Sequence, residues 1–202
     1  MSDCIRVAVV AFVTAVLLAC GGGGEGGASP RTVVELYGES TMTGYGATTS
    51  LPAELQKLRP DLEVIGRGVN STTASDQLKT WNPQASPARL VVINRGINEP
   101  YRGVPPEQFR ADLALLVRQA RDAGKHVILQ TPNPVTGELA AGVQTSAQVV
   151  REVASAMNVP LSDANAIPNA ASLLVDPLHP SNALIGLMAS DLARLIPTER
   201  SK

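Results

Sequence analysis

Short apolar runs rich in Val, Ile and Leu alternate along this sequence with longer stretches in which apolar residues recur every three or four positions. The short runs have the length and composition of buried β-strands, whereas the longer stretches have the period of amphipathic helices. Strands that alternate with helices predict βαβ units, a mainly parallel sheet and helices on both of its faces. The expected strands are Thr32–Tyr37, Leu62–Ile65, Leu90–Asn94, His126–Thr131 and a weaker Val159–Ser162.

The helical period is clearest over Phe109–Ala123, where Leu113, Leu116 and Val117 share one face and charged side chains occupy the other. Other segments with a helical pattern are Leu51–Leu58, Ala147–Met157 and Ala183–Ile196. The sequence shows no internal repeat and no break that would separate a second domain. We therefore expect one α/β domain over residues 32–197 and a C-terminal tail over residues 198–202.

The N-terminal segment has a different pattern. Arg6 is followed by a thirteen-residue apolar stretch, Val7–Ala19, which has the length of a signal-peptide core and is short for a membrane span. The stretch ends in Leu-Leu-Ala-Cys, which resembles a bacterial lipobox, where the signal is cut before a Cys that then carries lipid. We expect a signal peptide over residues 1–19 and lipidation of Cys20. An ordinary secretory signal with an incidental Cys is the alternative.

Residues 20–31 are rich in Gly and predict a flexible tether that joins the lipidated Cys to the domain. A protein of this kind is expected in the bacterial cell envelope, on the periplasmic or extracellular side, with the membrane as its partner through the anchor.

Composition limits the other partners. Hydrophobic residues make up 44% of the sequence and aromatic residues only 3%, so the core is expected to consist of Val, Leu, Ile and Ala. The formal net charge of −1 gives no electrostatic support for nucleic acid binding. Cys4 and Cys20 are the two cysteines and both precede the domain, which leaves no Cys for a disulfide or a metal site there. Two histidines give little support for a zinc site.

Polar residues follow several of the expected strands. In parallel sheets, sites form at the carboxyl ends of the strands. Ser40 comes directly after the first strand and can be a linker residue, a helix N-cap or a nucleophile. The segments that reach the same edge are Gly38-Glu39-Ser40, residues 67–73, residues 95–99 and Pro132-Asn133-Pro134.

A nucleophilic serine needs a base, an acid that orients the base and donors for an oxyanion. His179 lies just before the last helix, and Asp176 precedes it by three residues, a spacing that lets the carboxylate reach one ring nitrogen. The other interpretation of this segment is a proline-stiffened turn that caps the helix. His126 begins a strand, at the opposite edge, and is expected to be structural or on the surface.

Four short motifs therefore follow one another in order. They are Gly-Glu-Ser after the first strand, a Gly-rich loop after the second, Gly-x-Asn after the third and Asp-x-x-His before the last helix. This order resembles the SGNH, or GDSL-type, hydrolase family over nearly the whole domain. The resemblance implies a flavodoxin-like, three-layer α/β/α sandwich with a mainly parallel five-stranded sheet. It also implies the hydrolysis of carboxylic esters with no metal and no organic cofactor.

The same resemblance implies a role for each matching residue. Ser40 is the nucleophile, His179 the general base and Asp176 the residue that orients the base. The oxyanion hole consists of the backbone N–H of Ser40, the side-chain amide of Asn98 and a third donor. The third donor is the N–H of Ser71, with Gly68 as the alternative.

Several residues depart from the family pattern or surround the expected site. Gly66 replaces an Asn, and Ser71 replaces a Gly, so the third donor requires that Ser71 adopt the needed backbone angles without strain. Glu39 and Glu99 replace Asp and are expected to tie loops together through hydrogen bonds. The hydroxyl groups of residues 71–75 are expected to cap and to hold the loop.

Four larger side chains are expected near the rim of the site. Arg67 and Arg95 are expected to be solvated, with recognition of an acidic substrate as the alternative. Trp81 and Tyr101 are expected to flank the same rim, where packing and a glycan platform are both open.

The leading hypothesis is a serine esterase that hydrolyses short-chain acyl or acetyl esters through an acyl-enzyme. One alternative is an O-acetyl esterase or acyltransferase that acts on cell-envelope polysaccharide. Another is a non-catalytic binding lipoprotein with the same fold. Acyl length, the alcohol and the oligomeric state stay open.

Overall fold

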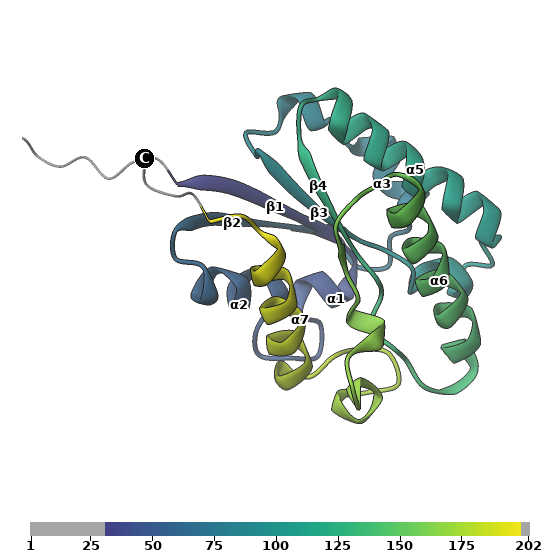
Figure 1. Ribbon diagram of the computed structural model, residues 1–202. Helices are drawn as coiled ribbons and strands as arrows, with labels where there is room; N and C mark the ends of the chain where they lie inside the picture. The colour runs from purple at the N-terminus through teal and green to yellow at the C-terminus, as the bar shows by residue number, and fades with distance from the viewer. Residues whose placement is uncertain (1–30, 199–202) are drawn as a thin grey trace, which may run out of the picture. The chain divides into compact units, whose positions relative to one another are not determined.

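A parallel β-sheet of five strands forms the centre of the computed structural model, which describes residues 31–198 (Figure 1). The strand order is β2-β1-β3-β4-β5, and each neighbouring pair is parallel. This topology confirms the expected α/β fold class and the five expected strands. The strands are β1 (Thr32–Gly38), β2 (Leu62–Gly68), β3 (Leu90–Asn94), β4 (His126–Gln130) and β5 (Leu161–Ser162).

Strand β2 is longer than its sequence indicates. It continues past Ile65 to Gly68, and it pairs with β1 along its whole length, up to Gly38 opposite Gly68. Parallel pairing supplies backbone hydrogen bonds that outweigh the low strand preference of Gly66 and its neighbours. The expected end of this strand was therefore wrong by three residues.

Helices cover both faces of the sheet, as Figure 1 shows. On one face, Leu55 of α2 and Met188 of α7 join Val34 and Leu36 in one apolar cluster. The structure has α1 (Ser40–Thr43), α2 (Leu51–Leu58), α3 (Ala74–Thr80), α4 (Asn98–Tyr101), α5 (Pro106–Asp122), α6 (Ala140–Ala156) and α7 (Asn182–Leu195).

The second apolar cluster lies on the other face of the sheet. Phe109 and Leu113 of α5 and Val150 of α6 pack there with Val91 and Ile93 of β3. Alternate residues of β3 thus serve opposite faces, because successive strand side chains point to opposite sides. The two clusters, one on each face of the sheet, form the cores of the described domain.

The short helices α1, α3 and α4 were not expected, and α6 begins earlier than expected. Helix α6 begins at Ala140, seven residues before the expected Ala147. The prediction missed its first two turns because they are rich in Ala, Gly and Thr and lack a clear apolar stripe. Helix α3 was not expected at all, since its start lies in a hydroxyl-rich segment. Thr73 and Asp76 form a capping box there, in which each side chain accepts the other's backbone N–H.

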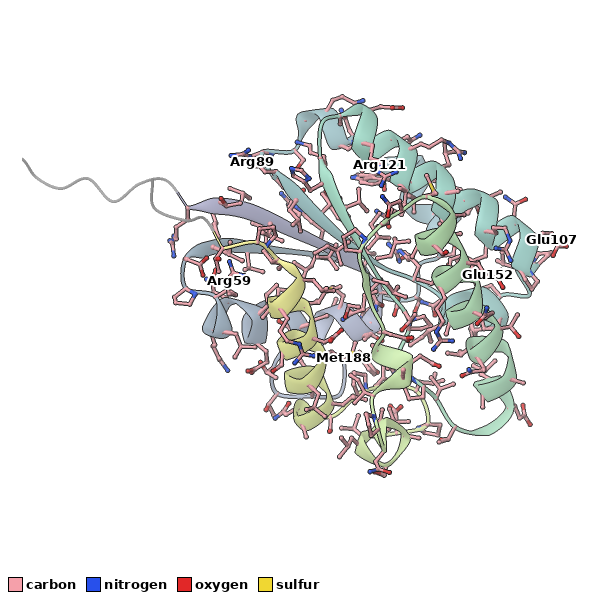
Figure 2. The ribbon with its side chains drawn as sticks, in the orientation of Figure 1. Arg59, Arg89, Glu107, Arg121, Glu152 and Met188 are labelled. Carbon is pink, nitrogen blue, oxygen red and sulfur yellow. The ribbon has the colours of Figure 1, made fainter. Side chains whose placement is uncertain are left out.

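Both ends of the described chain lie at the amino edge of the sheet (Figure 1). Arg59 fixes the end after α7 by donating hydrogen bonds to the carbonyl groups of Ala193, Ile196 and Pro197 (Figure 2). The expected signal peptide, Cys20 and nearly all of the tether and tail lie outside the described residues. Within residues 31–198, no helix is long and apolar enough to cross a membrane.

Candidate active site

Ser40 lies at the carboxyl edge of the sheet, at the first position of α1 and two residues after the end of β1. The turn between them is tight. A Cβ at Gly38 would lie 2.8 Å from the Cβ of Met42 and 3.2 Å from the carbonyl oxygen of Asn94, so this position requires glycine. The Ser40 side chain is largely buried by its surroundings, with 9% of the residue exposed.

His179 and Asp176 meet Ser40 in a continuous chain of contacts. His179 Nε2 lies 3.1 Å from Ser40 Oγ, and His179 Nδ1 lies 2.8 Å from Asp176 Oδ2. A carboxylate only accepts hydrogen bonds, so Nδ1 carries the proton and the lone pair of Nε2 faces the serine hydroxyl. This is the arrangement in which an imidazole can remove a proton from serine.

The turn that contains Asp176 holds its own carboxylate. Asp176 Oδ1 accepts hydrogen bonds from the backbone N–H groups of Leu178 and His179, both at 2.8 Å. Burial raises the pKa of Asp176, but the hydrogen bonds from His179 and from these backbone groups outweigh burial and lower the pKa below its usual value. Asp176 is therefore ionised at neutral pH and can stabilise an imidazolium.

Asn133 connects the two halves of the site and was not recognised as a site residue from the sequence. It is fully buried, its Oδ1 accepts a hydrogen bond from Thr41 of α1, and its Nδ2 donates to the carbonyl of Leu178. The Tyr45 ring lies against the imidazole of His179, with 4.7 Å between ring centroids. Asn133 lies between two prolines, a context that indicates only a turn.

A pocket of about 310 Å³ opens at these residues. Ser71 lines it and has φ of +59°, the left-handed conformation in which glycine is favoured. Ser71 therefore adopts the glycine-like backbone angles, but at a strain of the order of 1 kcal/mol, so only the expectation of an unstrained backbone was wrong. Gly68, the alternative, lines a different cavity. The pocket is lined by Ser40, Tyr45, Asn70, Ser71, Ile97, Asn98, Tyr101, Leu139, Leu178 and His179.

Three side chains that follow β3 hold the loop around Ser71. Asn98 Nδ2 donates to the carbonyl of Thr72 at 3.0 Å, and Arg95 donates to the same carbonyl and to the Thr72 hydroxyl. Glu99 Oε1 accepts the backbone N–H of Ala74 at 2.9 Å. The expected hydrogen bond between Glu99 and the loop is therefore present. Hydrogen bonds with the segment after β3 fix the loop that carries Ser71.

The expectation for Arg95 was wrong, because only 2% of this residue is exposed. Burial lowers the pKa of Arg95, and the charges of two buried acids, Glu39 and Glu99, oppose this decrease. Sequence reasoning placed it in solvent because an isolated arginine after a strand is usually exposed. Burial of Arg95 depends on Glu39, which is distant in the sequence and comes near only in the folded structure.

The expectation for Glu39 was also wrong. Within residues 31–198, neither carboxylate oxygen of this fully buried residue has a hydrogen-bond partner. Burial raises the pKa of Glu39 to about 7, and Glu99 adds to this increase, whereas Arg95 opposes it. Glu39 therefore titrates close to neutral pH directly beside the serine.

The other rim residues separate in space. Tyr101 is 70% exposed and lines the pocket, whereas Trp81 lines a different cavity and packs against Tyr37, so the two do not flank one rim. Arg67 is half-exposed and forms a 2.8 Å ion pair with buried Glu35. His126 is exposed at the start of β4, at the opposite edge of the sheet.

Comparison with known proteins places the chain in a family. The sequence profile of the GDSL-like lipase/acylhydrolase family matches residues 36–184. A search of curated proteins finds no match.

Solved structures share the fold at low identity. A lipase/acylhydrolase from Enterococcus faecalis has a TM-score of 0.72 at 23% identity, over 82% of this chain and 95% of its own. An acetylxylan esterase from Geobacillus stearothermophilus has a TM-score of 0.69 at 23% identity, over 85% and 97%. An aryl esterase from M. smegmatis has a TM-score of 0.68 at 22% identity, over 82% and 98%.

The family match extends from the middle of β1 to the start of α7 and so includes every segment that lines the pocket. The chain belongs to the GDSL-like lipase/acylhydrolase family and is a carboxylic ester hydrolase.

Proposed function

We propose that the protein is a serine esterase in which Ser40 is the nucleophile, His179 the general base and Asp176 the residue that orients the base. The observation that carries this proposal is the continuous Ser40–His179–Asp176 chain, with its contacts of 3.1 and 2.8 Å. The resemblance of the sequence to the family assigns the same three residues.

The reaction follows from the protons in this chain. His179 Nε2 accepts the proton of Ser40 as Oγ attacks the ester carbonyl, and it then donates that proton to the leaving alcohol. Asp176 stabilises the imidazolium that forms between these steps. Water releases the acyl group from Ser40 in a second cycle, with His179 again as the base.

The negative charge of the tetrahedral intermediate requires donors. The N–H of Ser40 is the first of α1 and needs no intrahelical acceptor. We assign it, the N–H of Ser71 and the amide of Asn98 to the oxyanion hole. Support comes from the pocket, which all three residues line.

The proposed substrates are acetyl and other short acyl esters. The pocket of about 310 Å³ is small, and its apolar wall consists of Ile97, Leu139 and Leu178, which suits a short acyl chain. The second candidate is an O-acetyl esterase that acts on cell-envelope polysaccharide. The similarity to an acetylxylan esterase favours it, and so does the proposed location, a lipid anchor at Cys20 in the bacterial envelope.

The test is hydrolysis of p-nitrophenyl acetate, butyrate and octanoate by the wild type and by Ser40→Ala. Acetate and butyrate should be cleaved faster than octanoate, and Ser40→Ala should abolish turnover. His126→Ala is the matched control, because it removes the other histidine and should leave the rates unchanged. Turnover that survives in a folded Ser40→Ala variant would refute the proposed nucleophile. Release of acetate from acetylated polysaccharide at a higher kcat/KM than from the small esters would favour the second candidate.

A further inference from the structure

A cavity of about 580 Å³ lies at the amino edge of the sheet, opposite the candidate active site. It is enclosed by residues that begin β1, β3 and β4, by the end of α5 and by the chain after α7. The reaction proposed above uses none of these residues. The cavity therefore requires an explanation of its own.

The cavity has an unbalanced charge. Among the residues that the structure describes, Arg89, Arg121 and Lys125 line it, and no Asp or Glu does. Within residues 31–198, none of these three cations forms a salt bridge with an acid; Arg121 and Lys125 donate only to backbone carbonyls, those of Asn158 and Ser86. Figure 2 shows Arg89 and Arg121 at this end of the sheet.

The larger cavity beside α3, of about 820 Å³, differs in this respect. Its lining contains both signs of charge, and these pair with one another, Arg67 with Glu35 and Lys79 with Asp76. Cations with acidic partners are largely neutralised, whereas the three at the amino edge keep a net attraction for an anion.

Most of the remaining wall of the amino-edge cavity is apolar. Leu90 and Ile128 contribute from the strands, and Leu195, Ile196 and Pro197 contribute from the end of α7 and the chain after it. A phosphate ion alone would fill a small part of such a volume and would leave the half-buried Leu195 and the exposed Pro197 in water. An anionic head joined to hydrocarbon satisfies both the cations and the apolar wall.

We propose that this amino-edge cavity binds the headgroup and adjoining acyl region of an anionic phospholipid at a membrane surface. Thr32, the first residue of β1, lines the cavity, so the segment that precedes the domain joins it at this surface. The carboxyl edge with Ser40 then faces away from the bilayer. The proposal does not depend on esterase activity.

The test is sedimentation of the chain from residue 21 onward with vesicles, because this form lacks the apolar N-terminal segment and retains both cores. The vesicles contain phosphatidylcholine alone or with 30% phosphatidylglycerol. Binding should require phosphatidylglycerol and should weaken as salt rises. The triple variant Arg89→Gln, Arg121→Gln, Lys125→Gln should bind about a hundredfold more weakly, since each cation near an anionic surface contributes roughly a factor of five.

The matched control is Lys79→Gln, Arg102→Gln, Arg110→Gln, which removes the same charge away from the amino-edge cavity and should bind like the wild type. Hydrolysis of p-nitrophenyl acetate by the amino-edge variant should be unchanged, which separates lipid binding from the esterase proposal. Equal loss of binding in both triple variants would overturn the proposal in favour of net charge. Binding of inorganic phosphate without binding of vesicles would overturn the lipid as the ligand.

Discussion

At the scale of single residues, the candidate site is built from side chains that position other side chains. Asn133 holds α1 and the His179 turn at once, and Glu99 holds the loop that carries Ser71 through the N–H of Ala74. Rate therefore depends on residues that need not touch the substrate. A small displacement at any of them changes the geometry at Ser40.

Asn98→Ala should lower kcat by roughly two to three orders of magnitude, with KM little changed. The reason is that an oxyanion donor acts mainly in the transition state, where one donor contributes about 3 kcal/mol. Steady-state kinetics on p-nitrophenyl acetate measures this. Asn70→Ala is the control, because Asn70 lines the same pocket but accepts a hydrogen bond from Thr43. A kcat/KM of Asn98→Ala within a few-fold of wild type would remove Asn98 from the hole.

The sequence predicted the contact between Ser40 and the Asp176–His179 pair through its resemblance to the family, because the turn taken alone was equally consistent with a helix cap. It was not sufficient for Arg95 or Glu39. Burial of a charged residue depends on partners distant along the chain, and no local pattern records them.

At the scale of elements, the apolar runs predicted the five strands well. The short polar helices have no such run, so the sequence pattern did not predict them. Burial on both faces leaves a continuous Val/Ile/Leu signal in β3 and β4. Helix α3 has seven residues and leaves almost no apolar period, so only its capping residues could have indicated it.

The start of α3 should link stability to activity. Thr73→Ala removes a side-chain cap and should lower the free energy of unfolding by about 1 kcal/mol. It should also lower kcat, because Ser71 lies two residues before this cap. Urea unfolding and esterase assays measure the two effects.

Ser50→Ala provides the comparison, since Ser50 caps α2 by accepting the N–H of Ala53. It should lower stability to a similar extent and leave kcat unchanged. Equal kcat values for the Thr73 and Ser50 variants would show that the Thr73 cap does not hold the loop that carries Ser71.

At the scale of the whole molecule, Glu39 should make stability depend on pH. Its folded pKa of about 7 exceeds the ordinary value of 4.5, so the folded state keeps a proton that the unfolded state releases. The contribution of Glu39 to stability should therefore fall as pH rises from 4.5 to 7, by about 3 kcal/mol. Glu39→Gln removes this loss, so it should gain stability relative to wild type between pH 4.5 and 8.

Urea unfolding at pH 4.5 and at pH 8 measures the difference in the free energy of unfolding between Glu39→Gln and wild type. Glu152→Gln is the control, because hydrogen bonds from Gln148 and Arg110 lower the pKa of exposed Glu152. Its stabilisation is present above the unfolded pKa, so the difference between this variant and wild type should change little from pH 5 to 8. A pH-independent difference for Glu39→Gln would show that Glu39 stays ionised.

The contact between Ser40 and His179 spans 139 residues of sequence. A ribosome that has made β1 to β5 has produced Ser40 but not His179, the base proposed above. With the proposed pair, chains that end before His179 should lack esterase activity during synthesis. The onset of activity would mark the arrival of His179 at the carboxyl edge of the sheet.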